Sequence, residues 1–431
     1  MTDQYPNTRR RAVNMLSQVL DKNRQLEDIL SENLKGLSNR DRALARAMAS
    51  TCLRHLGIID SLIDKMLDRP LPKAATNIRN VVRIGLAQIL FMDIPAHAAV
   101  HDTVELIPQN SKFKGLVNAL LRRADRQGAK LLTRINKAHK NTPDWLWKNW
   151  KSHYGAEAAE KIALAHLNEA PLDISVKKDP EIWAEKLDCK LLPTGHLRKS
   201  AGGAVTAFEG FENGDWWIQD FAASLPVKLF PDLLGKRVLD VCAAPGGKTA
   251  QLAVRGAKVT AIDRSKARLG RLSENMDRLQ LEVTVKAADA AGYLPAEPFD
   301  AVLLDAPCSS TGTIRRHPDV AWLKSPEDVE KLVQLQSRLL DATISQLKSG
   351  GVLVYSTCSL QPEEGELQIE AFLDRHQNMK RLPVRSDEVG GLAEIISEKG
   401  DLRCLPFHLK NEEDQTLSGM DGFYAARMVK E

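Results

Sequence analysis

Two cysteines occupy matching positions in the second half of the chain, each directly after a short apolar run. Cys308 follows the run Phe299–Asp305, and Cys358 follows the run Val352–Thr357. If both runs are adjacent strands, the thiols lie at the edge where doubly wound sheets bind their ligands, and if both strands also neighbour the first strand, Arg237–Cys242, both thiols face that ligand. A thiolate at that edge can act as a nucleophile and form a covalent intermediate. The simpler alternative is that both cysteines are small buried residues.

The other cysteines give no sign of a metal site or a disulfide framework. They are spread singly, with no Cys-x-x-Cys pair and no Cys/His cluster at zinc spacing, so we expect no metal. No apolar run reaches the roughly 18 residues of a membrane span, and the polar start Met1 to Arg11 has no signal-peptide core. We therefore expect a cytoplasmic protein, and a monomer. These four cysteines are Cys52, Cys189, Cys242 and Cys404.

A glycine-rich loop follows an earlier apolar run, Arg237–Cys242. Glycine lets the backbone approach a ligand closely at the start of a helix, although an ordinary strand-to-helix turn is the plainer interpretation. A Walker A loop needs glycine where Cys242 stands, and the Gly-x-Gly-x-x-Gly fingerprint is absent, so ATP and NAD are disfavoured. The whole signal reads Asp240-Val241-Cys242-Ala243-Ala244-Pro245-Gly246-Gly247-Lys248-Thr249.

Three aspartates follow successive apolar runs. Asp263 comes after the second run, where a carboxylate suits a ribose diol. Asp289 follows the third run and suits the exocyclic amine of adenine, and Asp305 ends the fourth. A single carboxylate at such a place is commonly a helix cap. Three of them in register with the glycine-rich loop favour one ligand that lies across the carboxyl edge of the sheet.

The elements that must position these residues follow two patterns. From Gly235 onward, apolar runs alternate with helical segments, which predicts a mostly parallel, doubly wound α/β sheet. From Thr8 to about Arg126, apolar residues recur at helical spacing, which predicts an all-helical domain. The apolar runs are Arg237–Cys242, Lys258–Ile262, Glu282–Ala287, Phe299–Asp305, Val352–Thr357 and Gly422–Val429.

Charge distinguishes the same two parts of the chain. Residues 1–126 carry 20 lysines and arginines against 13 aspartates and glutamates, whereas the remainder is slightly acidic. This excess of positive charge predicts an anionic partner for the first part. We expect a helical domain at 1–126, a linker at 127–142, a mixed α/β segment at 143–221 and a catalytic domain at 222–431.

Taken together, these motifs resemble one enzyme family. The second half is similar to the Sun/Fmu-type RNA cytosine-5 methyltransferases, most of all to those of bacterial 16S ribosomal RNA, and residues 1–126 are similar to the RNA-binding antiterminator NusB. The first likeness rests on the glycine-rich loop and on Asp305-Ala306-Pro307-Cys308, Arg315-Arg316-His317-Pro318-Asp319, Thr357-Cys358-Ser359 and Asp421-Gly422-Phe423-Tyr424. The second rests on Ile94–Val100 and Lys114–Arg122.

The resemblance implies a Rossmann-like, S-adenosyl-L-methionine-dependent methyltransferase domain that follows a NusB-like domain. It implies methylation of carbon-5 of a cytosine in 16S ribosomal RNA, with Cys358 attacking carbon-6, Cys308 assisting release and Asp305 binding the base. The residues alone leave the order of the two cysteines open, because DNA cytosine-5 methyltransferases use the cysteine of a Pro-Cys motif. The cofactor contacts that it implies are Cys242, Ala243, Ala244, Pro245, Gly246, Gly247, Lys248, Asp263, Asp289 and Asp305.

Further residues carry weaker expectations. Lys248 pairs with either the methionine carboxylate of the cofactor or Asp305, unless it is simply solvated. The basic run Arg315, Arg316 and His317 suits RNA phosphates, with a solvated loop as the alternative. Segment 143–221 is expected to bind RNA, yet the Arg-x-Asn element of the family is missing there. The chain reads Ile174-Ser175-Val176-Lys177-Lys178 instead.

Two rival functions fit the sequence less well. A non-catalytic RNA-binding protein with a decayed methyltransferase domain has no need of both Cys308 and Cys358. An adenine or guanine N-methyltransferase carries an Asn/Asp-Pro-Pro-aromatic element where this chain has Asp305-Ala306-Pro307-Cys308, and it needs no nucleophilic cysteine.

Overall fold

In the computed structural model the chain forms two compact units, each with its own core. The structure describes residues 8–72, 75–200, 202–203 and 205–431, so the expected domain at 1–126 and the polar start Met1 to Arg11 begin outside the described residues. The helical unit extends to Leu167 and also includes the segment Ile314–Lys324. The sheet unit holds Asn168–Thr313 and Ser325–Glu431.

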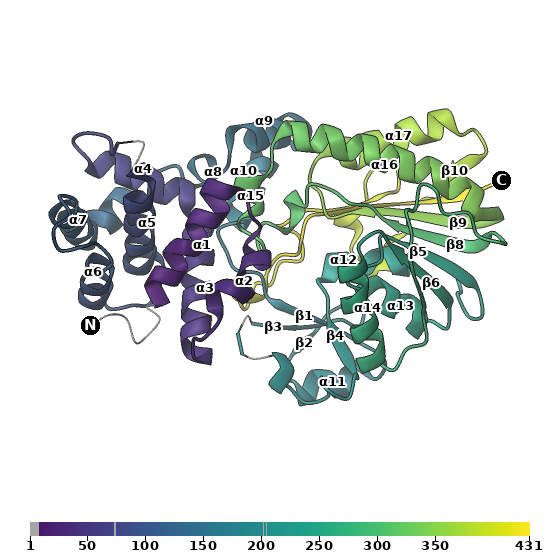
Figure 1. The fold of residues 1–431 in the computed structure, drawn as a ribbon. Coiled ribbons are helices and arrows are strands. Elements are labelled where there is room, and N and C mark those ends of the chain that lie inside the picture. The colour runs from purple at the N-terminus through teal and green to yellow at the C-terminus, as the bar shows by residue number, and fades with distance from the viewer. Residues whose placement is uncertain (1–7, 73–74, 201, 204) are drawn as a thin grey trace. The chain divides into compact units, whose positions relative to one another are not determined.

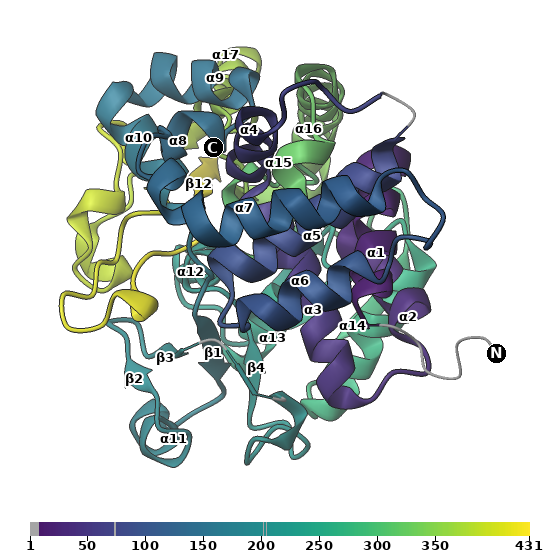
Figure 2. The same ribbon diagram turned by 90° about the vertical axis from the view of Figure 1, so that its left-hand side faces the viewer.

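The helical unit packs its helices around one apolar core. In α1 the buried residues recur at helical spacing (Ala12, Met15, Leu16 and Val19), so the helix turns one face inward. Figure 2 shows α1, α3, α5, α6 and α7 packed side by side. The described helices are α1 (Thr8–Lys22), α2 (Leu26–Leu34), α3 (Asn39–Arg54), α4 (Leu56–Met66), α5 (Thr76–Phe91), α6 (Ala96–Val104), α7 (Lys114–Leu132), α8 (Lys137–Lys140), α9 (Asp144–Tyr154) and α10 (Ala156–Ala165).

The segment Ile314–Lys324, which contains α15 (Val320–Leu323), is part of this helical packing. Arg54 Nη1 donates to the carbonyl of Arg315 at 2.7 Å, and the indole of Trp322 donates to the carbonyl of Leu53 at 2.9 Å. Asp319 Oδ2 accepts from the backbone N–H of Leu26 at 2.9 Å. That N–H belongs to the first turn of α2, where the helix itself offers no partner, so Asp319 caps α2.

The sheet unit begins with a small antiparallel sheet in the order β2-β3-β1-β4. A buried ion pair crosses it: Arg198 Nε donates to Asp173 Oδ1 at 2.6 Å, and both side chains are almost fully enclosed. The turn at Asn213-Gly214 leads into the last of its strands. The elements are β1 (Leu172–Val176), α11 (Pro180–Lys186), β2 (Lys190–Leu191), β3 (Leu197–Lys199) and β4 (Trp216–Ile218).

The large sheet runs in the order β10-β12-β9-β8-β5-β6-β7, with β11 paired to β12. The strands β9, β8, β5, β6 and β7 are parallel, and β12 is antiparallel to β9. This confirms the predicted α/β sheet. Its strands are β5 (Arg237–Val241), β6 (Lys258–Asp263), β7 (Thr284–Ala287), β8 (Phe299–Asp305), β9 (Leu347–Thr357), β10 (Met379–Arg381), β11 (Leu402–Cys404) and β12 (Phe423–Lys430).

Successive residues of each central strand point to opposite faces of this sheet. Val238, Leu303 and Val354 join the core that α12 (Phe221–Lys228) and α13 (Gly247–Val254) cover. Their chain neighbours Leu239, Leu304 and Tyr355 join the core beneath α16 (Pro326–Gln346) and α17 (Glu366–Arg375). Figure 1 shows α16 and α17 on one side of the strands and α13 on the other, with α14 (Lys266–Arg278) beside it. Both faces are therefore covered, and the ends of the strands are left for chemistry.

Two divisions of the chain differ from the expected domain boundaries. The compact helical unit continues past 126 and 142 to Leu167, because α9 and α10 pack on each other and α10 packs on α8. Within 222–431, the segment Ile314–Lys324 groups with the helical unit because its hydrogen bonds go there. Among the helices of the described ranges, none is long and apolar enough to cross a membrane.

Candidate active site

The thiols of Cys308 and Cys358 meet at the carboxyl edge of the large sheet, with their Sγ atoms 3.5 Å apart. They come together because β8 and β9 are parallel neighbours with Asp305 opposite Ser356. Beyond the strands, the Gly312 N–H donates to the carbonyl of Cys358 at 3.0 Å and keeps the two loops paired. Both cysteines are half-buried. The prediction that the two cysteines end adjacent strands is confirmed. The expectation that both strands neighbour the first strand is wrong, because β8 lies between β9 and β5.

The two thiols have different electrostatic surroundings. A hydrogen bond from Cys308 lowers the pKa of Cys358, and a hydrogen bond from Ser310 and the charge of Lys248 act in the same direction. The pKa of Cys308 is raised well above its usual range by its hydrogen bond to Cys358, by burial and by the negative charge of Glu364. Cys358 is therefore the thiol that ionises first, with Cys308 as the donor of the hydrogen bond that stabilises the thiolate.

Asp305 lies at the end of β8 beside the thiols, and its two oxygens have different partners. Lys248 Nζ donates to Oδ2 at 2.9 Å, and Ser356 Oγ donates to Oδ1 at 2.9 Å. Of the two partners expected for Lys248, the structure shows Asp305, and the ammonium also lies 4.8 Å from the ring centre of Phe423. Because the Asp305 side chain is one-third exposed, its carboxylate remains accessible to a ligand.

The glycine-rich loop connects β5 to α13 and is held from outside by α14. Arg268 donates to the carbonyl of Ala244, and Asn275 Nδ2 donates to that of Pro245 at 3.0 Å. Gly246 has φ +106°, and an added Cβ would lie 3.1 Å from Leu272, so a side chain here is strained and crowded. Burial raises the pKa of Cys242 to about 12, which leaves this cysteine a neutral thiol at the loop's start.

The carboxylates expected on the neighbouring strands differ in burial. Asp263 ends β6 and is 5% exposed; it accepts from the Ser265 N–H, and Arg268 Nη1 lies 3.3 Å from it. Asp289 lies beyond β7, is exposed and accepts from the Ala291 N–H. Asp240 of β5 is fully buried; burial raises its pKa to about 7, and its Oδ1 has no hydrogen-bond partner in the structure.

These residues fit a methyl-donor nucleotide. The loop carries no side chain at Gly246 and Gly247, so a ligand can approach its backbone. Since α13 begins at Gly247, the first N–H groups of this helix face the loop. Asp263 presents a carboxylate at the adjacent strand end, as a ribose diol requires. Within the described ranges, no group of three His, Cys, Asp or Glu side chains is placed to hold a metal ion.

The three basic residues expected to contact RNA differ in how far they are exposed. The Arg315 side chain is buried, with its residue 3% exposed, whereas Arg316 is half-buried and His317 is exposed. All three belong to the segment that packs in the helical unit.

Two residues of the site were missed in the sequence, and a third, Asp240, was quoted at the start of the loop signal without a role. Arg268 is exposed on α14, and Glu364 lies five residues beyond Ser359, the last residue of the second cysteine motif. Glu364 is fully buried and joins the loops of the two cysteines. The only sequence signal for it is its place in the segment after β9, seven residues beyond Thr357.

Two protein families match this chain. The family model described as 16S rRNA methyltransferase RsmB/F matches residues 231–429, and the NusB family model matches residues 6–126. The chain is 38% identical over 391 residues to the ribosomal RNA small subunit methyltransferase B of Yersinia pestis. The aligned region covers 86% of this chain and 90% of that protein.

Solved structures from Pyrococcus horikoshii share the fold. A methyltransferase homologue is 28% identical, with a TM-score of 0.53 over 66% of this chain and 94% of its own. The NSun6 structure is 22% identical, with a TM-score of 0.54 over 67% of this chain and 98% of its own. The chain is therefore an enzyme with S-adenosylmethionine as its cofactor, and it belongs to the 16S rRNA methyltransferase RsmB/F family, with a NusB-family domain at its start.

Proposed function

We propose that this enzyme transfers a methyl group from S-adenosylmethionine to carbon-5 of a cytosine in 16S ribosomal RNA, through a covalent bond between a cysteine and carbon-6. The observation that carries the proposal is the pair of thiols 3.5 Å apart at the strand ends, beside Asp305. Carbon-5 of cytosine is a weak nucleophile, and a thiolate added to carbon-6 makes it a stronger one. A methyltransferase acting on an amine or a hydroxyl needs no such pair.

In the proposed mechanism, the Cys358 thiolate attacks carbon-6 of the cytosine. Asp305 hydrogen-bonds the Watson–Crick edge and favours protonation of the ring, so that the electron pair of the broken double bond is available at carbon-5 for the methyl group. Bound S-adenosylmethionine supplies that methyl group as an electrophile. A base then removes the carbon-5 proton, the double bond re-forms, and the electron pair of the carbon–sulfur bond returns to Cys358.

The roles of the two thiols follow from their different pKa directions. Cys358 starts as the nucleophile because its pKa is lowered, whereas Cys308 stays protonated beside it. Cys308 then assists the last step, in which the product leaves Cys358. Lys248 holds Asp305 in place through its ion pair, and Ser356 fixes the second oxygen of the same carboxylate.

RNA reaches this site as an unstacked base, which a single-stranded loop provides at little cost. We propose that residues 1–126 supply RNA affinity, supported by their excess of positive charge and their match to the NusB family. We also propose Asp289 as a contact to the adenine amine, and Arg316 and His317 as phosphate contacts. Because the proposed substrate is ribosomal RNA, we assign the enzyme to the cytoplasm. We also propose that it is a monomer.

The test is product analysis after incubation of the full chain with 16S ribosomal RNA and methyl-labelled S-adenosylmethionine. The RNA is digested to nucleosides and the label is separated by chromatography. We expect label in 5-methylcytidine and none in a transcript of the same length without cytosine. Label in an N-methylated adenosine or guanosine, or transfer to the cytosine-free transcript, would show that the proposal is wrong.

A further inference from the structure

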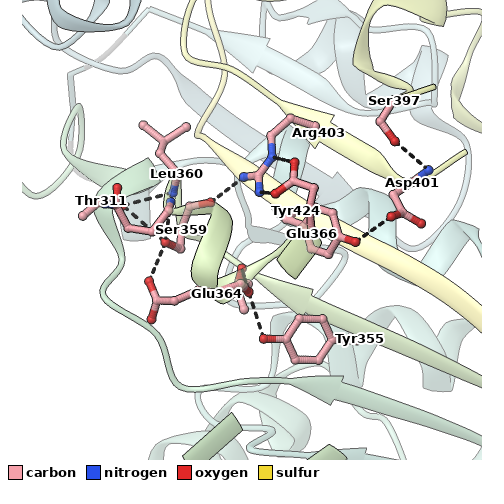
Figure 3. A network of polar contacts seen from close by, with 12 residues as sticks. Thr311, Tyr355, Ser359, Leu360, Glu364, Glu366, Ser397, Asp401, Arg403 and Tyr424 are labelled. Carbon is pink, nitrogen blue, oxygen red and sulfur yellow. Dashed lines mark hydrogen bonds and ion pairs between the residues drawn. The ribbon is translucent and has the colours of Figure 1, made fainter. Parts of the chain in front are cut away.

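Glu364 lies buried between the loops of the two cysteines, and its carboxylate accepts four hydrogen bonds. Oε1 accepts from the Ser309 N–H at 2.9 Å and from Gln336 Nε2 at 3.0 Å. Oε2 accepts from the hydroxyl of Ser309 and from that of Ser359, the latter at 2.6 Å. Ser309 directly follows Cys308 and Ser359 directly follows Cys358, so one carboxylate joins the two loops. Figure 3 shows its contact with Ser359.

The backbone of Glu364 is fixed as firmly as its side chain. Its carbonyl accepts from the Tyr355 hydroxyl at 2.9 Å and from Thr357 Oγ1 at 3.3 Å, both in β9. Gln336 of α16, which donates to the carboxylate, also donates to the carbonyl of Pro307 at 2.9 Å. The position of the carboxylate is therefore set by β9 and α16. The two cysteine loops are held in place by their hydrogen bonds to it.

On the other side of the Cys358 loop lies a second anchor. Arg403 Nη1 donates to the carbonyl of Ser359 at 2.7 Å, while its Nε and Nη2 hold Glu366 at 2.8 and 2.6 Å. Figure 3 shows Ser359 between Glu364 and Arg403. The guanidinium is thus occupied by Glu366, and the four groups that hydrogen-bond the Glu364 carboxylate are all uncharged.

A buried carboxylate held by neutral donors is an unusual choice for a cross-link, because a neutral amide costs less to bury. The charge has an identifiable target in the site. The hydrogen bond to Cys358, burial and the charge of Cys358 raise the pKa of Cys308 most, and the negative charge of Glu364 adds to them. Burial raises the pKa of Tyr355, and the charge of Glu364 acts in the same direction. The same residue that joins the loops therefore favours the protonated form of one thiol.

We propose that Glu364 is a positioning residue for methyl transfer: its carboxylate holds the two cysteine loops at contact distance and keeps Cys308 in the thiol form beside Cys358. This inference rests on the proposed roles of the two cysteines. The charge of Glu364 adds to the repulsion that a thiolate at Cys358 already exerts on a second thiolate, and a neutral Cys308 can donate to the Cys358 thiolate across 3.5 Å.

The first experiment compares Glu364→Gln with the matched control Glu330→Gln in the full chain. Glutamine keeps the size of the side chain and removes its charge, whereas alanine would leave four donors without their acceptor; Glu330 is exposed on α16. We expect Glu364→Gln to lower kcat by about tenfold to hundredfold, as a small misplacement of reacting groups does. The KM for S-adenosylmethionine and the midpoint of thermal unfolding should stay close to those of the control.

The second experiment measures the ionisation of the Cys308 thiol in the absence of RNA and of methyl transfer. In a Cys358→Ala background, alkylation of Cys308 by iodoacetamide is followed by mass spectrometry as a function of pH, with and without Glu364→Gln. Removing a negative charge stabilises the thiolate, so we expect the alkylation midpoint of Cys308 to move to lower pH. The Glu330→Gln variant should leave that midpoint where it was.

These readouts separate the two ideas. An unchanged midpoint, or a wild-type kcat in Glu364→Gln, overturns the role of Glu364 even if the enzyme makes 5-methylcytosine. A lower kcat together with a lower midpoint of thermal unfolding than in Glu330→Gln also overturns the proposal, in favour of a merely structural role. If instead the wild type makes no 5-methylcytosine while the midpoint shifts, the proposed function fails and the action of Glu364 on Cys308 stands.

Discussion

The chain that follows β8 passes through two environments, and they differ in what the sequence reveals. Residues 306–313 stay at the edge of the sheet, where Gly312 pairs with the Cys358 loop. Residues 314–324 leave the sheet unit and pack in the helical unit, where Asp319 caps α2. The first stretch is placed by the strand it follows, and the second is placed by partners that are about 270 to 290 residues away in sequence.

Residues can be assigned to a site from sequence only where the chain stays next to the strand that it follows. Parallel strands with hydrogen-bonded register bring their ends to one edge, so residue types at those ends can be combined into a site from sequence alone. A segment that docks elsewhere has no such constraint. Its basic residues looked like a free loop for RNA, yet Arg315 is buried in the helical unit.

The largest effect is expected at the sheet edge. Asp305→Asn keeps the shape of the side chain but removes the charge that pairs with Lys248 and that should assist protonation of the cytosine. We expect kcat to fall by about 10²-fold to 10⁴-fold, the usual contribution of a positioned acid or base, with little change in stability. Steady-state kinetics with 16S ribosomal RNA measures this, and the exposed Asp277→Asn on α14 is the control. An unchanged kcat would contradict the role of Asp305.

A medium effect of a different kind is expected in the segment 314–324. Asp319→Ala removes the acceptor for the Leu26 N–H, so we expect the free energy of unfolding of the helical unit to fall by about 1–2 kcal/mol. Denaturant unfolding followed by circular dichroism measures it. Asp319→Asn, which retains an acceptor oxygen, should lose less. The affinity for S-adenosylmethionine should not change, and a weaker affinity would mean that this segment acts on the cofactor site.

The smallest effect separates two adjacent arginines. Arg316 is half-buried, so its loss should flatten the salt dependence of RNA binding by a slope of roughly 0.7 if it makes one phosphate contact on single-stranded RNA. Arg315→Ala should leave the slope unchanged, because its side chain is buried. Binding isotherms at several salt concentrations decide this. A flattened slope in Arg315→Ala would return that residue to the RNA interface.

The sequence predicted the fold and the centre of the site because both follow local rules. The apolar run Phe299–Asp305 is β8 to the residue, and the runs before Asp263 and Cys358 end within one residue of β6 and β9. Asp305 was one of two partners expected for Lys248, and the pair forms because Lys248 lies in the first turn of the helix after β5 while Asp305 ends the neighbouring strand β8.

The remainder depended on packing that no local pattern encodes. Glu364 has the sequence surroundings of an exposed turn, and only the meeting of β9, α16 and two loops makes it a buried acceptor of four hydrogen bonds. The division of the chain at Leu167 likewise depends on how α9 and α10 pack, which their apolar faces alone do not reveal.

The most direct test of the account is the fate of the covalent bond to RNA in the two cysteine variants. Each full-length variant is incubated with 16S ribosomal RNA and S-adenosylmethionine and then separated by denaturing electrophoresis. Cys308→Ala should attack and methylate the cytosine but fail to release it, so it should accumulate a protein–RNA adduct. Cys358→Ala should form no adduct and no 5-methylcytosine, because the first bond cannot form. A stable adduct from Cys358→Ala, with none from Cys308→Ala, would contradict the account and make Cys308 the nucleophile.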